Sequence, residues 1–75
     1  MNNHSHKRMC DFLEGQKFTF IETDKNGIKK YIREGIMTVE VGELGWDAFG
    51  ADGRDFQGSN ARYSELAMIL AEYRK

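Results

Sequence analysis

Residues 16–41 limit the possible folds more than any other part of the chain. Residues 17–23 are rich in aromatic and β-branched side chains, which favour strands. Asn26 and Gly27 follow, and this dipeptide is the strongest short hairpin signal, because a type I′ turn needs positive φ at both central positions. The remainder forms two further runs around a second turn, namely 28–33, Glu34 with Gly35, and 36–41. The segment therefore predicts a three-stranded antiparallel meander.

The faces of this meander follow if both turns contain two residues. Ile21 then lies opposite Ile32, and Ile32 lies opposite Met37, since side chains alternate between the faces of a strand. One face is expected to be apolar: Ile21, Ile28, Ile32, Met37, Val39 and Val41. The second face is mixed: Phe18, Phe20, Glu22, Asp24, Lys29, Tyr31, Arg33, Ile36, Thr38 and Glu40.

A short helix is predicted before the meander, over residues 5–14. Met9, Phe12 and Leu13 stand at positions i, i+3 and i+4, which lie on one helical face. Ser5 is a suitable N-cap, and Gly15 can close the helix in the left-handed conformation.

The C-terminal half combines an irregular segment with a second helix. Residues 42–58 hold five of the eight glycines, so we expect a long loop, with a short fourth strand over 46–49 as the alternative. Residues 60–75 are predicted to be the main helix, capped by Ser59 or Asn60. Its apolar stripe is Tyr63, Leu66, Ala67, Leu70 and Tyr73. The predicted fold is α+β, with this helix packed across the apolar sheet face.

Size and composition restrict the function. The 75 residues form a single domain, 1–75, of which we expect residues 1–8 to be flexible. A chain this short buries only about 60% of its unfolded surface, so enclosing a substrate is difficult and we expect no enzyme. The net charge of −1 argues against a dedicated binder of phosphate backbones. With a single cysteine and no apolar leader, the chain is expected to be cytoplasmic.

The chain has too few histidine and cysteine residues to form a structural zinc site with four protein ligands. His4, His6 and Cys10 are the candidates, and they supply three ligands where a structural zinc site needs four. No phosphate-binding glycine motif is present. We therefore expect neither a metal nor a cofactor, and no part of the chain resembles a membrane span.

The aromatic residues of the glycine-rich segment are the leading candidates for binding. Aromatic residues and arginine dominate the energetics of protein interfaces, and the segment supplies Trp46, Phe49, Arg54 and Phe56. The alternative is that its three aromatic rings close the end of the core. The leading hypothesis is a small non-catalytic protein-binding module of a bacterial or phage accessory type. It would use these residues or an unpaired strand edge, and a homodimer is one specific version.

A second hypothesis is binding of nucleic acid to the mixed sheet face. Aromatic rings beside cations can stack single-stranded bases, and this face would offer Phe18, Phe20, Lys29, Tyr31 and Arg33. Its carboxylates would repel phosphates. The structural alternative is that the N-terminal helix covers Phe18 and Phe20.

Overall fold

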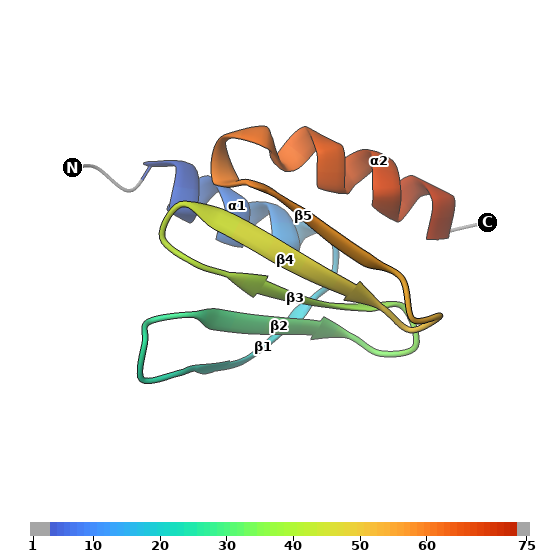
Figure 1. The fold of residues 1–75 in the computed structure, drawn as a ribbon, viewed down its shortest axis with the longest axis horizontal. Coiled ribbons are helices and arrows are strands. Elements are labelled where there is room, and N and C mark those ends of the chain that lie inside the picture. The colour runs from blue at the N-terminus through green and yellow to red at the C-terminus, as the bar shows by residue number, and fades with distance from the viewer. Residues whose placement is uncertain (1–3, 74–75) are drawn as a thin grey trace.

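The computed structural model describes residues 4–73, including all side chains except those of 4–6, 61 and 63. Two α-helices enclose five strands in the sequence (Figure 1). In chain order the elements are α1 (His4–Gly15), β1 (Thr19–Thr23), β2 (Lys29–Arg33), β3 (Met37–Val41), β4 (Gly45–Gly50), β5 (Asp55–Ser59), the 3₁₀ turn η1 (Asn60–Arg62) and α2 (Tyr63–Tyr73).

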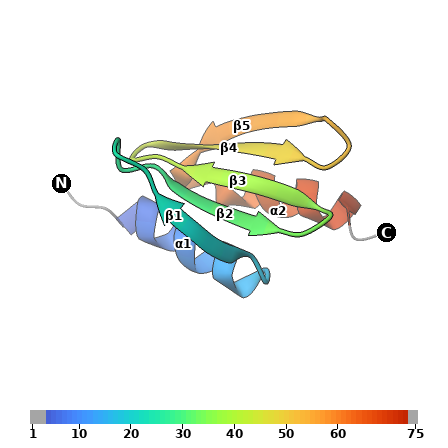
Figure 2. The ribbon, with the colours of Figure 1, turned by 90° about the horizontal axis from the view of Figure 1, so that it is seen from below.

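The strands form one antiparallel sheet in the order β1-β2-β3-β4-β5. Both helices lie on the same face of this sheet (Figures 1 and 2). The α+β class and the meander are confirmed, whereas the expected three or four strands are in fact five. Residues 4–8, expected to be flexible, begin α1, and residues 1–3 lie outside the described part of the chain.

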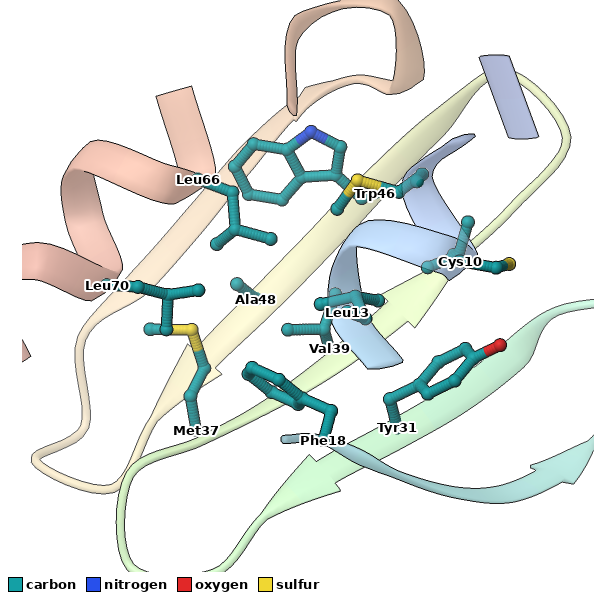
Figure 3. Packing of buried hydrophobic residues seen from close by; sticks show 12 residues of the cluster. Cys10, Leu13, Phe18, Tyr31, Met37, Val39, Trp46, Ala48, Leu66 and Leu70 are labelled. Carbon is teal, nitrogen blue, oxygen red and sulfur yellow. The ribbon is translucent and has the colours of Figure 1, made fainter. Parts of the chain in front are cut away.

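A single core fills the space between the sheet and the two helices. α1 contributes Met9 and Leu13, and α2 contributes Leu66 and Leu70. Figure 3 shows Leu13, Leu66 and Leu70 in this cluster. The other buried apolar side chains are Cys10, Phe18, Tyr31, Met37, Val39, Val41, Trp46 and Ala48. The predicted apolar faces of both helices therefore enter the core, as does the predicted face of β3.

The predicted register of β2 is wrong, because each of its turns is one residue longer than expected. Thr23 pairs with Lys29, and the amide of Asp24 donates to the carbonyl of Ile28, so three residues connect this pair. At the other end Arg33 pairs with Met37, again across three residues. One extra residue exchanges the faces of a strand. Tyr31 consequently faces the helices, while Ile32 faces away from them.

β4 and β5 form a hairpin over residues 45–59, where we expected a long loop, and the alternative of a fourth strand over 46–49 is confirmed as part of β4. β4 alternates between buried Trp46 and Ala48 and the outward-facing Asp47 and Phe49. This period of two is the signature of a half-buried strand. Gly58 on β5 is required by packing, because a Cβ there would lie 2.5 Å from Cζ2 of Trp46. The glycines that suggested a loop therefore also serve close packing within the sheet.

The end of α1 differs from the prediction in its capping residue. Lys17 has a φ of 69°, whereas Gly15 is not among the residues with positive φ. The amide of Phe18 donates to the carbonyl of Leu13 at 3.0 Å, and the amide of Lys17 donates to Glu14 at 3.1 Å. These two bonds define a Schellman motif with Lys17 in the left-handed position.

Replacing Lys17 by glycine should stabilise the protein. The left-handed conformation costs a side-chain-bearing residue about 1 kcal/mol that glycine does not incur. We expect the free energy of unfolding to rise by about 0.5–1 kcal/mol, measured by urea denaturation. The control is Gln16→Gly, at a position without positive φ, which should not stabilise. A loss of stability in Lys17→Gly would contradict the assigned cap.

Asn60 joins the start of the C-terminal helical segment to the turn between β3 and β4. Its buried side-chain amide donates from Nδ2 to the carbonyls of Gly42 at 2.9 Å and Glu43 at 3.1 Å. Its Oδ1 is buried and has no hydrogen-bond partner among the described residues. Asn60 is one of the two predicted helix caps, but its side-chain oxygen accepts no hydrogen bond from the described residues of the helix. Its side-chain nitrogen instead donates to two backbone carbonyls in the β3–β4 turn.

Candidate functional site: the helix-free face of the sheet

One complete face of the sheet carries neither helix (Figure 2). Register and alternation assign to this helix-free face the side chains that point away from the core. They are Thr19, Glu22, Lys30, Ile32, Thr38, Glu40, Asp47, Phe49, Asp55, Gln57 and Ser59. Antiparallel sheets often leave one face in water, and that face is then normally polar. Apolar residues on this face are therefore the positions that indicate a binding surface.

An apolar patch interrupts the helix-free face near the turn between β2 and β3. Ile32 pairs with Thr38, and Thr38 pairs with Phe49, so the three side chains lie in one row across three strands. The Phe49 side chain is 41% exposed. A shallow hollow adjoins the row and is also lined by Ile36 and Ala51. An aromatic ring beside a hollow offers a place for an apolar side chain of a partner.

A row rich in carboxylates lies next to this patch. Across the sheet it reads Glu22, Lys30, Glu40, Asp47 and Gln57. Lys30 forms an ion pair with Glu22 at 3.5 Å. Glu40 lies directly opposite Asp47, and in the described part of the chain no cation forms an ion pair with either. Like charges in directly opposed positions destabilise a sheet. This pair therefore has an electrostatic cost, which Lys30 opposite Glu40 offsets in part and a cationic partner would relieve further.

A second, polar hollow lies at the β4–β5 side of the carboxylate row. Asp47 and Gln57 line it, together with Trp46 and the backbone of Gly45 and Gly58. A Cβ on Gly45 would lie 2.8 Å from the carbonyl oxygen of Gly58, so a larger residue does not fit there without a shift. Glycine at this position therefore keeps the two strands close and leaves room above them.

A polar and aromatic corner joins the β4–β5 turn to the end of α2. The Tyr73 hydroxyl donates to Oδ1 of Asp52 at 2.7 Å, and the Arg54 guanidinium lies 5.1 Å from the Phe56 ring centre and 5.9 Å from that of Tyr73. The bond from Tyr73 lowers the pKa of the Asp52 carboxyl. Burial, followed by the same bond, raises the pKa of the Tyr73 hydroxyl. These contacts fix the hairpin to the helix.

The four residues predicted to bind a protein occupy three different environments. Trp46 is 2% exposed and donates from Nε1 to the carbonyl of Ser59 at 3.1 Å, so it belongs to the core. Phe49 lies on the helix-free face. Arg54 and Phe56 belong to the corner with Tyr73. The structure therefore does not bring the four residues together. The alternative, that the aromatic rings close the end of the core, holds for Trp46 and in part for Phe56.

The residues considered for nucleic-acid binding are mainly on the helix-covered side. Phe18 and Tyr31 are buried and present no free ring face, whereas Phe20 is 48% exposed and contacts Tyr31 edge to face at 5.5 Å. Burial and a hydrogen bond with Cys10 raise the pKa of the Tyr31 hydroxyl. Lys29 and Arg33 share the alternation of Tyr31 and so also lie on the helix side.

The residues that sequence reasoning missed are Ile32, Glu40, Asp47 and Gln57 as members of one surface. The signal that could have shown Asp47 is its place between Trp46 and Ala48, because a polar residue between two apolar ones is typical of a half-buried strand. Glu40 and Ile32 could be placed on this face only with the correct turn lengths. Within residues 4–73 no cluster of possible metal ligands occurs, and the side chains of His4 and His6 lie outside the description.

Helix length gives no indication of a membrane span. No helix in the described part of the chain is long and apolar enough to cross a bilayer.

Comparisons with known proteins give no indication of function, so a proposal for function has to start from the surface geometry. No family model, no curated protein and no solved structure matches this chain.

Proposed function

We propose that this protein is a non-catalytic domain that binds another protein through the helix-free face. The observation that carries the proposal is the position of exposed Phe49 beside the opposed pair Glu40 and Asp47 on a sheet face that neither helix covers. An aromatic anchor beside unpaired charge is a common composition of a binding surface.

The surface fits a partner that presents an apolar and a cationic side chain close together. Asp47 and Phe49 are two residues apart on β4, which places their side chains about 7 Å apart on the same face. Neighbouring side chains on one face of a helix have a similar spacing, of about 6 Å. A basic amphipathic helix could therefore place leucine-like side chains on Phe49 and Ile32 and cations on Glu40 and Asp47.

The charge of the face supports a protein partner over a nucleic acid. Its strand residues include four carboxylates and one cation: Glu22, Glu40, Asp47 and Asp55 against Lys30. Such a surface repels a phosphate backbone. The aromatic residues that could have stacked on bases, Phe18 and Tyr31, are buried.

The test uses two synthetic helical peptides of equal length. One carries leucine on one face and lysine on the other, and the second replaces every lysine with glutamate. We expect the folded protein to bind only the basic peptide, with an affinity that falls as salt rises, because salt screens exposed charges. Titration calorimetry and fluorescence anisotropy measure both. A single-stranded oligonucleotide, titrated at low salt, tests the nucleic-acid alternative.

Matched variants locate the binding surface. Phe49→Ser, and separately the pair Glu40→Gln with Asp47→Asn, should each raise the dissociation constant about tenfold. Met68→Ser on α2 removes an apolar residue that is even more exposed than Phe49, and Glu34→Gln with Glu43→Gln removes two charges from turns. Neither control should change the dissociation constant. Equal binding of the two peptides, equal effects of the control variants, or tighter binding of the oligonucleotide would overturn the proposal.

A further inference from the structure

The two edge strands of the sheet differ in how well they are protected. β5 begins with Asp55, and α2 lies beside it through the contact between Tyr73 and Phe56. All five residues of β1 are exposed, and Phe20 and Ile21 at its centre are 48% and 50% exposed. Natural edge strands usually carry charges or proline, because their free backbone groups attract other strands.

The centre of β1 carries little of this protection. Thr19, Phe20 and Ile21 are uncharged, and the first charged residue of the strand is Glu22. A β-bulge separates Phe20 from Glu22, and bulges can blunt an edge. It leaves Thr19 and Phe20 in regular pairing with β2, opposite Ile32 and Tyr31. The N-terminal half of β1 therefore retains an extended backbone and an exposed aromatic ring.

We propose that β1 pairs with β1 of a second copy of this chain, in antiparallel orientation about a twofold axis at Phe20. The two Phe20 rings then meet at the axis. Each ring already contacts Tyr31 edge to face at 5.5 Å, so the pairing extends one aromatic row across both copies. Aromatic pairs on adjacent strands stabilise a sheet beyond the area that they bury.

The β-bulge in β1 favours this register over its neighbour. With the axis at Phe20, the central pair is formed by a residue in regular pairing with β2, and Thr19 lies opposite Ile21 of the second copy. With the axis at Ile21, the central pair would be formed by the residue at which the register of β1 shifts. The register at Phe20 also places no like charges opposite each other within β1, whose one charged residue is Glu22.

The joined sheet would have ten strands and keep all four helices on one face. A twofold axis perpendicular to the sheet does not exchange its two faces. The helix-free faces of the two copies therefore lie on the same side and form one continuous surface. Self-pairing and peptide binding on the helix-free face then use different residues. The dimer goes beyond the proposed function, and either proposal can fail without the other.

The experiment is a light-scattering measurement of solution mass over a wide range of protein concentration. We expect the wild-type chain to approach twice its monomer mass as concentration rises. Phe20→Lys places two ammonium groups against each other at the axis and should raise the dimer dissociation constant about tenfold or more. The matched control is Gln57→Lys on the other edge strand, which should leave the mass unchanged.

A second variant and a folding check separate the possible outcomes. Phe20→Ser removes the ring without adding charge and should also weaken the dimer. Circular dichroism and thermal unfolding of each variant at low concentration show whether the monomer is folded. A wild-type chain that stays monomeric at every concentration, or a dimer unaffected by Phe20→Lys, would overturn the proposal. The basic peptide should bind the folded Phe20→Lys monomer as well as it binds the wild type.

Discussion

Replacing Trp46 by alanine should lower the free energy of unfolding by about 3–5 kcal/mol. The indole is 2% exposed, donates to the carbonyl of Ser59 at 3.1 Å and lies against the bare backbone of Gly58. Alanine would leave a cavity where the ring fills the space between the hairpin and the helices, and would remove the hydrogen bond to the carbonyl of Ser59. Urea denaturation followed by circular dichroism measures the loss, since the variant has no tryptophan to report by fluorescence.

The comparison with exposed aromatic residues makes this result specific. Phe49→Ser, on the helix-free face, should cost much less stability than Trp46→Ala, because water already reaches its ring. Gly58→Ala should fall between them, at about 1–3 kcal/mol, because its Cβ would overlap the indole. A loss below about 1 kcal/mol in Trp46→Ala would show that the ring is not packed, and Trp46 would again be a candidate binding residue.

Exchange of Asn60 for aspartate should cost about 3 kcal/mol or more near neutral pH, although the two side chains have the same shape. The amide donates two hydrogen bonds to the carbonyls of Gly42 and Glu43 in a buried position. An ionised carboxylate donates none and would place negative charge against both carbonyl oxygens. Circular dichroism during urea denaturation gives the difference from the wild type.

The pH dependence of this variant identifies the cause. Burial beside two carbonyls raises the pKa of the introduced carboxyl above its unfolded value of about 3.9. The folded state then binds the proton more tightly, so the variant is most stable below that value and loses stability as pH rises toward the folded pKa. Asn60→Ala should cost about 1–3 kcal/mol without this dependence. An equal loss for both variants at all pH values would refute the assigned bonds.

Much of the secondary structure could be predicted because it depends on local patterns. The spacing of Met9 and Leu13 predicts the face of α1, and that of Leu66 and Leu70 predicts the face of α2; all four side chains are buried. The alternation in 37–41 likewise predicts which side of β3 is inside. In each case the period of the apolar residues is set by the geometry of a single element. The buried face can therefore be predicted without knowledge of contacts between distant residues.

The candidate site could not be predicted because it depends on turn length. Asn26 with Gly27 correctly marks a hairpin, but the same residues fit a two-residue turn and the three-residue connection that forms. This single residue decides whether Tyr31 or Ile32 faces the helices. The opposition of Glu40 and Asp47 depends in addition on the pairing of β3 with β4. Local sequence alone carries little information on either point.

The sequence by itself determined the α+β class, the order of a helix, a meander and a helix, and the inner faces of both helices. Those properties follow from backbone preferences and from the periodic placement of apolar residues. Only the tertiary structure decided that Gly58 accommodates Trp46, that Lys17 rather than Gly15 closes α1, and that the carboxylates gather beside Phe49. These features arise where segments distant in sequence meet, or where one backbone conformation satisfies several hydrogen bonds at once.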